Sequence, residues 1–177
     1  SYIVGGTPTN LGVNAHAGSG AALVIEADEY DRMFLGLKPH VAVVTNVEHD
    51  HPDCYPSAED FYQAFSAFSR CVQPDGMLVA CGDDPGASRL MVEARASGMR
   101  VTAYGIEAEG LSYRAVNLSL NLNGGFSFDV LCSLADGFEL RPAVHLQVPG
   151  RHNVLNALAA LAVAHQQELS PVQAGEA

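Results

Sequence analysis

The chain of 177 residues is long enough for one domain with a substantial core, and its 48% hydrophobic content is typical of a globular protein. Its formal net charge of −11 argues against nucleic acid as a partner, because that interaction depends on clustered lysine and arginine side chains. We find neither an apolar stretch long enough to span a bilayer nor a secretory signal, so we expect a cytoplasmic protein with no membrane partner.

Short apolar runs alternate with helical segments in the first two thirds of the chain. We expect strands at residues 2–4, 22–26, 41–46, 77–81 and 101–104. One helix is expected after Ser57, with phenylalanines at helical spacing, and a second begins at Asp83-Asp84-Pro85 and stops at Gly98. Apolar runs of this kind are typical of parallel strands buried on both faces. The alternation predicts an α/β fold, a three-layer sandwich with a mostly parallel sheet flanked by helices.

The pattern changes after Gly105, where polar and apolar residues alternate. Strands at residues 112–121, 125–134 and 138–148, around turns at 123–125 and 135–137, predict a small antiparallel β meander at about residues 108–148. We expect this meander to pack as an appendage on the α/β core. A helix rich in alanine and leucine follows at residues 154–165, and the tail from Ser170 is interpreted as a linker or a cut edge.

Acidic and imidazole side chains gather where the strand at residues 41–46 ends. Glu48, His49, Asp50 and His51 follow the strand directly. Open α/β sheets bind ligands beyond the carboxyl ends of their strands, and such groups can ligate a metal or transfer protons. The alternative is a solvated acidic turn with chance histidines, and the residues alone favour neither interpretation.

Glu26 ends the strand at residues 22–26. If this strand and the one at 41–46 are parallel neighbours, Glu26 and His51 lie at the same edge and could hold Mg²⁺ or Mn²⁺. The acids at positions 28, 29 and 31 are better explained as the N-cap and first turn of a helix.

Nucleotide-binding signals are weaker. Asn153 and Asn156 lie three positions apart, hence on one face of a helix, and amides suit the edge of an adenine. Taken alone, Asn153 is better explained as an ordinary N-cap. The glycines between residues 5 and 20 follow no phosphate-binding pattern, and the only lysine, Lys38, precedes a proline, so the chain has no Walker A loop. The four cysteines are widely spaced and are expected to be reduced, buried small side chains.

Four segments together carry a family resemblance. They are Glu26-Ala27-Asp28-Glu29-Tyr30-Asp31, Thr45-Asn46-Val47-Glu48-His49-Asp50-His51, Cys81-Gly82-Asp83-Asp84-Pro85 and Gly150-Arg151-His152-Asn153-Val154-Leu155-Asn156-Ala157. In order and spacing this set resembles the central domain of Mur ligases over nearly the whole chain. Within that family, the chain looks most like the enzymes that join L-alanine to UDP-N-acetylmuramate.

The resemblance implies an ATP-dependent amide ligase of peptidoglycan synthesis. ATP would phosphorylate the muramoyl carboxylate to an acyl phosphate, which the amine of L-alanine would then attack, with magnesium neutralising the phosphates. By matching motif, Glu26 would hold one magnesium ion and His51 a second, while Asp50 would orient the site as a catalytic residue. His152, Asn153 and Asn156 would line the adenine pocket.

The resemblance also implies that residues 1–177 form only the central ATPase-type domain, without the P-loop, the N-terminal UDP-binding domain or the C-terminal domain, and that this part alone is inactive. A ligase that recycles murein tripeptide onto UDP-N-acetylmuramate is the nearest alternative. Folylpolyglutamate synthetase shares the scaffold but fits the motifs less well. A metal-dependent hydrolase using His49, Asp50, His51 and Asp53 and a non-catalytic nucleotide-binding module are alternatives of other classes. The sequence carries no signal of an oligomeric state.

Overall fold

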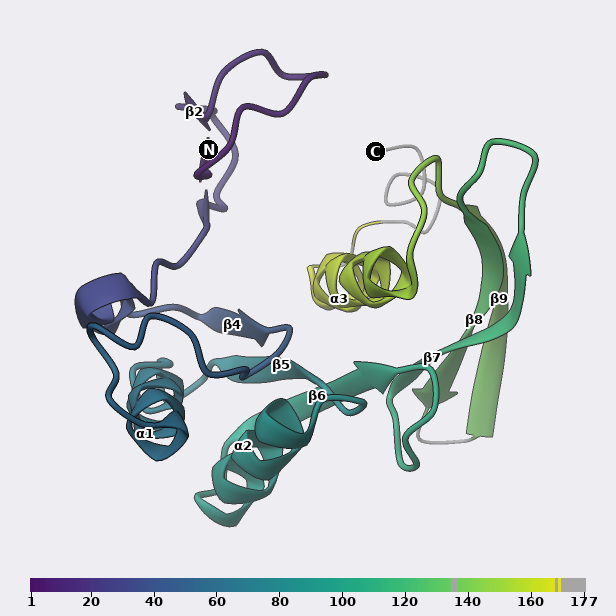
Figure 1. The fold of residues 1–177 in the computed structure, drawn as a ribbon. Coiled ribbons are helices and arrows are strands. Elements are labelled where there is room, and N and C mark those ends of the chain that lie inside the picture. The colour runs from purple at the N-terminus through teal and green to yellow at the C-terminus, as the bar shows by residue number, and fades with distance from the viewer. Residues whose placement is uncertain (135–136, 168, 170–177) are drawn as a thin grey trace. The chain divides into compact units, whose positions relative to one another are not determined.

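The structure is a computed structural model that describes residues 1–134, 137–167 and 169, and the chain divides into two compact units (Figure 1). The first unit comprises residues 1–36 and the second begins at Leu37. The predicted tail from Ser170 and the turn at residues 135 and 136 lie outside the described residues.

The first unit contains a small sheet and one short helix. Its elements are β1 (Tyr2–Ile3), β2 (Ala15–His16), β3 (Val24–Ile25) and the 3-10 helix η1 (Tyr30–Gly36). The order is β2-β1-β3, with β1 antiparallel to β2 and parallel to β3. The condition that the strands at residues 22–26 and 41–46 are parallel neighbours is therefore not met, because β3 pairs with β1 in a separate sheet. Val24 is 61% exposed, so the predicted burial of this strand is wrong; a unit this small covers little apolar surface.

The second unit is built on one six-stranded sheet in the order β4-β5-β6-β7-β8-β9. The strands are β4 (Val41–Val44), β5 (Met77–Cys81), β6 (Arg100–Gly105), β7 (Tyr113–Leu120), β8 (Phe126–Leu134) and β9 (Gly137–His145). Pairing is parallel from β4 to β7 and antiparallel from β7 to β9.

We expected the meander to be an appendage, but it is part of the same sheet. β7 joins β6 through the pairs Tyr104↔Tyr113 and Gly105↔Arg114. This parallel junction is only two residue pairs long, so the pattern of polar and apolar residues in the sequence does not predict the pairing of β7 with β6. The α/β class with a mostly parallel sheet and an antiparallel extension is confirmed.

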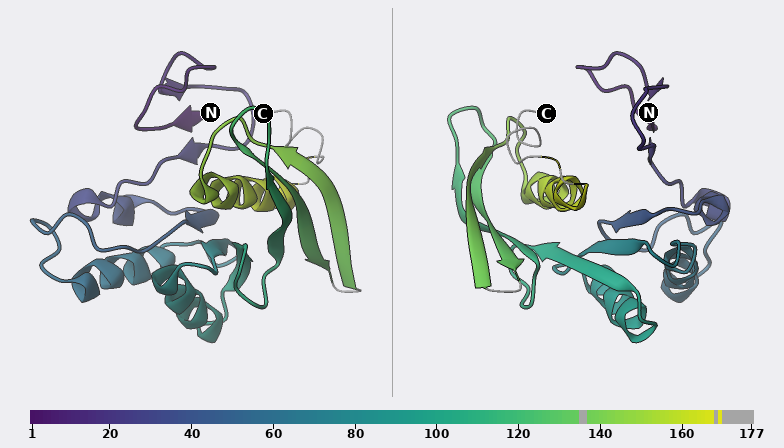
Figure 2. Two further views of the ribbon diagram at one scale, coloured as in Figure 1. Left: turned by 45° about the vertical axis from the view of Figure 1, so that its right-hand side comes forward. Right: turned by 180° about the vertical axis from the view of Figure 1, so that it is seen from behind.

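Three helices cover the sheet and complete the predicted three layers. α1 (Ala58–Ser69) and α2 (Pro85–Ala96) lie on one face, and α3 (Arg151–Gln166) lies on the other (Figures 1 and 2). The predicted caps are present, since Ser57 accepts from the backbone N–H of Asp60 and Asp84 from that of Ala87. α3 begins three residues earlier than predicted, after Gly150 with a φ of 100°. None of the helices described is long and apolar enough to cross a membrane.

The strand β5, which lies between β4 and β6, is buried along its whole length, as predicted, with Leu78, Val79 and Ala80 fully shielded from solvent. The same prediction holds on only one face of β4, where Ala42 and Val44 are buried while Val43 is 42% exposed. β4 is the edge strand of the sheet, and strand order is a property of the tertiary fold that an apolar run does not encode.

All four cysteines are free thiols, as predicted. Cys81 and Cys132 are buried, and burial raises the pKa of both thiols, which keeps them protonated. Cys54 and Cys71 are only partly buried, so the prediction of burial is wrong for these two.

Truncation of the α3 face should show how much this helix contributes to the core. Leu158 is fully buried on α3, and Leu158→Ala is expected to lower the free energy of unfolding by ~3 kcal/mol, because the mutation removes buried methyl groups and leaves a cavity. Urea denaturation followed by circular dichroism measures the loss. Leu120→Ala, at a side chain 73% exposed, is the matched control and should cost less than ~0.5 kcal/mol. Equal losses in the two variants would contradict the assigned packing of α3.

Candidate functional site

Hydrogen bonds hold the loop after β4 both before and after the predicted cluster of acidic and imidazole side chains. The backbone N–H of Val47 donates to Asp84 Oδ1 at 3.0 Å. His49 Nε2 lies 2.8 Å from the carbonyl oxygen of Tyr55, which is fully buried, so this ring nitrogen carries the proton and donates. His49 is therefore a structural side chain of the loop, and Nε2 is committed to a carbonyl.

Asp50 and His51 lie in the same loop, and the backbone of His51 is tightly constrained. Its N–H donates to Asp50 Oδ1 at 2.7 Å, and its carbonyl oxygen accepts from the N–H groups of Cys54 and Tyr55, both at 2.9 Å. His51 adopts a φ of 52°, a conformation that residues other than glycine seldom adopt and that surrounding bonds must hold in place. The His51 side chain is 33% exposed, so the constrained backbone presents an imidazole to solvent.

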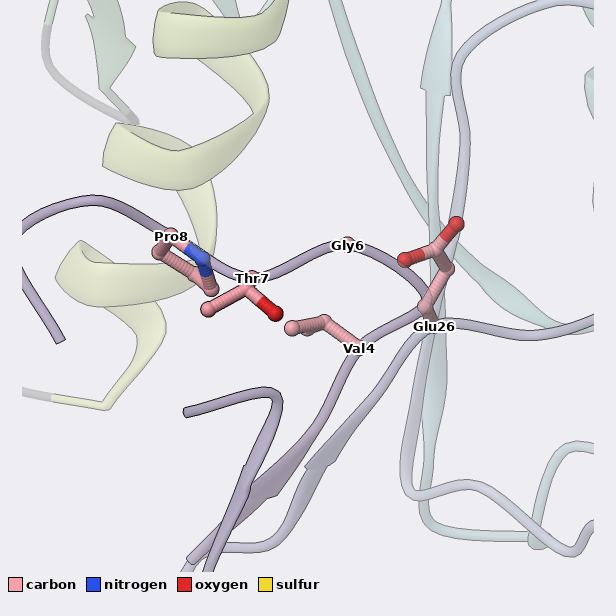
Figure 3. Close-up of a pocket in the computed structure, with 5 residues that line it drawn as sticks. All are labelled: Val4, Gly6, Thr7, Pro8 and Glu26. Atoms are coloured by element: carbon pink, nitrogen blue, oxygen red, sulfur yellow. The ribbon is translucent and has the colours of Figure 1, made fainter. Parts of the chain in front are cut away.

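Glu26 lies in the first unit, directly after β3. Its Oε2 accepts the backbone N–H of Gly5 at 2.6 Å, and its own N–H donates to the carbonyl oxygen of Ile3 at 2.9 Å. The carboxylate borders a hollow of about 360 Å³ that is also lined by Val4, Gly6, Thr7 and Pro8 (Figure 3). The sheet pairing thus places Glu26 beside the glycine-rich turn after β1. Its predicted convergence with His51, which belongs to the other unit, stays a prediction.

Of the acids that follow Glu26, Asp28 takes the expected capping role, because its Oδ1 accepts the N–H of Tyr30 at 2.9 Å, where η1 begins. Asp31 has a φ of 49° at a kink within η1, so it does not lie in a regular first turn as expected.

The predicted adenine-contacting residues lie together in the first two turns of α3. Asn153 is not the N-cap, since Gly150 takes that position without a side-chain hydrogen bond to the helix. Asn153 instead donates from Nδ2 to the carbonyl oxygen of Pro149 at 2.6 Å. His152 and Asn156 are exposed, and the helix places Asn156 one turn after Asn153 on the same face.

Among the residues that the structure describes, no group of three or more His, Cys, Asp and Glu side chains could hold a metal. His49, the first residue of the hydrolase alternative, uses Nε2 to bond the carbonyl oxygen of Tyr55, which argues against that alternative. A carboxylate such as that of Glu26 is a ligand type that Mg²⁺ accepts, because Mg²⁺ typically takes one or two protein side chains and completes its shell with phosphates and water.

Asp83 and Asp84 were predicted only to begin a helix, but they also hold loops that flank the site. Asp83 and Asp84 follow β5, and their carboxylates bind backbone N–H groups in the loops that flank the site, at Val47 and at residues 106–108. The consecutive carboxylates before a proline were a signal for the helix start only. Gly86 and Gly105 allow the close approach of these loops. These glycines are the further signal in the sequence that could have indicated tight packing of the loops.

Both a protein-family model and curated relatives match most of this chain. Residues 6–164 match the family model of the Mur ligase middle domain. A UDP-N-acetylmuramate–L-alanine ligase from Arthrobacter sp. (strain FB24) is 45% identical over 172 residues, covering 97% of this chain and 34% of that protein. The chain thus spans about a third of the length of the curated relatives it matches.

Two solved structures are similar over most of the chain. One is a UDP-N-acetylmuramate:L-alanyl-gamma-D-glutamyl-meso-diaminopimelate ligase from Neisseria meningitides, with a TM-score of 0.78 and 29% identity over 99% of this chain and 55% of that chain. The other is a UDP-N-acetylmuramate-alanine ligase from Thermotoga maritima, with a TM-score of 0.70 and 25% identity over 93% of this chain and 34% of that chain.

Proposed function

Because the chain belongs to the Mur ligase family, whose middle domain it matches over residues 6–164, we propose that it is the central ATPase-type domain of a cytoplasmic ligase that joins L-alanine to UDP-N-acetylmuramate. The observation that carries the choice of amino acid is the 45% identity over nearly the whole chain to an L-alanine ligase. The UDP-sugar and amino acid sites would then belong to parts of the full-length protein beyond residues 1–177. The reaction would use ATP to form an acyl phosphate on the muramoyl carboxylate, as a step of peptidoglycan synthesis.

Within this proposal, Glu26 and His51 hold magnesium, which supplies neutralisation of the phosphate charge. Asp50 orients His51 through the bond to its backbone N–H. His152, Asn153 and Asn156 contact the adenine from the start of α3. The support for these roles is that Glu26 directly follows β3, Asp50 and His51 lie in the constrained loop after β4, and the other three residues lie in the first two turns of α3.

The full-length protein should release phosphate from ATP only when UDP-N-acetylmuramate and L-alanine are both present. The acyl phosphate breaks down productively only when an amine attacks it, so both substrates are required for turnover. A coupled phosphate assay, with each substrate omitted in turn as control, measures this dependence. Rapid release with neither substrate would contradict a ligase.

The tripeptide-recycling ligase is a second candidate, favoured by the structural similarity to the Neisseria meningitides protein at a TM-score of 0.78. The same assay separates the two candidates when L-alanine is replaced by L-alanyl-γ-D-glutamyl-meso-diaminopimelate. Turnover with the tripeptide but not with L-alanine would move the assignment to the recycling enzyme.

A further inference from the structure

The carboxylate of Asp84 connects the start of α2 to the loop after β4. One oxygen, Oδ1, accepts both the N–H of Ala87 at 2.7 Å and the N–H of Val47 at 3.0 Å. The first bond caps the helix, and the second spans 37 positions of the chain. Asp84 is thus more than an N-cap, because it also holds a backbone group in the loop that leads to His51.

The close approach of Val47 to α2 has independent support. A Cβ atom at Gly86 would lie 2.7 Å from both the Cβ and the carbonyl oxygen of Val47. Only glycine allows this contact between the first turn of α2 and the loop. The structure therefore uses two neighbouring residues, Asp84 and Gly86, to place the same point of the backbone.

The carboxylate of Asp83 holds a different loop, the one after β6. Its Oδ2 accepts the N–H of Ile106 at 2.6 Å, and its Oδ1 accepts those of Ala108 at 2.8 Å and Glu107 at 3.1 Å. Gly105 again allows the approach, since a Cβ there would lie 2.7 Å from Asp83 Oδ1. Both oxygens of Asp83 are thus occupied by backbone N–H donors.

The two loops lead to opposite parts of the proposed site. Val47 precedes His51 by four positions in the loop after β4. In the loop after β6, Glu107 forms an ion pair with Arg151, which begins α3 next to His152 and Asn153. One aspartate therefore acts on the metal side and its neighbour acts on the adenine side.

We infer that Asp83 and Asp84 are positioning residues that set the two halves of the site separately: Asp84 places the loop that presents His51, and Asp83 places the loop that meets the start of α3. The inference rests on the proposed function for the roles of those halves. Catalytic geometry is sensitive to small displacements, and a loop that loses its bond to a carboxylate leaves its backbone N–H groups without that partner.

The experiment compares Asp84→Ala and Asp83→Ala in the full-length protein. For Asp84→Ala we expect the magnesium concentration for half-maximal rate to rise about tenfold, while the KM for ATP stays near the wild-type value. For Asp83→Ala we expect the KM for ATP to rise by about the same factor, with the magnesium requirement unchanged. Parallel changes of both constants in both variants would overturn the inference.

The conservative variants sharpen the test, because the two carboxylates are used differently. Asn supplies one acceptor oxygen and one N–H₂ donor. Asp84→Asn should restore the magnesium requirement, since a single oxygen makes both bonds of Asp84. Asp83→Asn should not restore the KM for ATP, because its N–H₂ group would face an N–H donor. Failure of Asp84→Asn to rescue would contradict the role of the shared oxygen.

A matched control separates positioning from simple loss of a helix cap. Ser57 caps α1 through the N–H of Asp60 at 3.1 Å, and the bonds of its side chain stay within that cap. Ser57→Ala should lower Tm without changing either kinetic constant. A change of the magnesium requirement in Ser57→Ala as large as that in Asp84→Ala would show a general structural effect and overturn the inference.

Amide hydrogen exchange tests the inference even if the full-length protein proves to have a different activity. Asp84→Ala should accelerate exchange at Val47 and leave residues 106–108 near the wild-type rate, and Asp83→Ala should do the reverse. Unchanged exchange at Val47 in Asp84→Ala would overturn the inference. Absence of ligation by the wild-type protein would contradict only the proposed function.

Discussion

Replacement of His51 by alanine in the full-length protein is expected to lower the rate of L-alanine ligation by about 10²- to 10³-fold, the effect of removing one group that stabilises charge in a transition state. The structure fixes the backbone of His51 through its N–H and its carbonyl oxygen, with a φ of 52°, and leaves its imidazole a third exposed. A side chain held in this way suits a metal ligand. The initial rate of phosphate release, measured over a range of magnesium concentrations, checks the result.

A second imidazole provides the control for this variant. His40 precedes β4, its side chain is 50% exposed, and its Nδ1 lies 3.8 Å from Asp75 Oδ1 on the surface. His40→Ala should keep the wild-type rate, because such an exposed pair contributes little. A wild-type rate in His51→Ala would refute the proposed role of His51, and an equal fall in His40→Ala would point to a general effect of losing a surface histidine.

Removal of the Glu26 carboxylate is expected to have an effect of similar size. Glu26→Ala should reduce ligation by about 10²-fold or more, because the phosphates of ATP would lose a magnesium ligand and the charge it balances. Glu26→Gln is the decisive variant, since its amide oxygen can still accept the N–H of Gly5, which Glu26 Oε2 now accepts at 2.6 Å. If the charge holds a metal, Gln should be nearly as inactive as Ala in the same ligation assay.

The opposite result for Glu26→Gln has an equally clear meaning. A near-wild-type rate in Gln together with a low rate in Ala would show that Glu26 serves only to fix the turn at Gly5. Glu29→Ala is the control for loss of a nearby carboxylate, because that residue was assigned to the beginning of a helix. It should retain the wild-type rate.

Local sequence signals were sufficient where local interactions determine the structure. β5 is a continuous apolar run and is buried throughout, and the caps at Ser57 and Asp84 mark where α1 and α2 begin. The order of the strands was not predictable in this way. Val43 belongs to a run as apolar as β5, yet it is exposed because β4 lies at the edge of the sheet. The connection of β7 to β6 rests on two residue pairs and left no pattern to detect.

The site shows the same division. The candidate residues could be named from their positions at strand and helix ends, and the structure places Asp50 and His51 in one constrained loop and Asn153 and Asn156 on one face of α3. The fate of His49, which bonds to the Tyr55 carbonyl, could not be foreseen among four adjacent polar residues. Nor could the bonds of Asp83 and Asp84, because their partners lie 23 to 37 positions away in the chain.

The position of α3 also matters while the protein is being made. α3 contacts β5, β6, β7 and β8, and its Val154, Leu158 and Ala162 are fully buried (Figure 1). Synthesis proceeds from the N-terminus, so all six strands leave the ribosome before the residues that cover this face of their sheet. A nascent chain that ends before Arg151 would leave Tyr113, which contacts His165 of α3, without this cover, so this interval is the one in which that face of the sheet is exposed to aggregation.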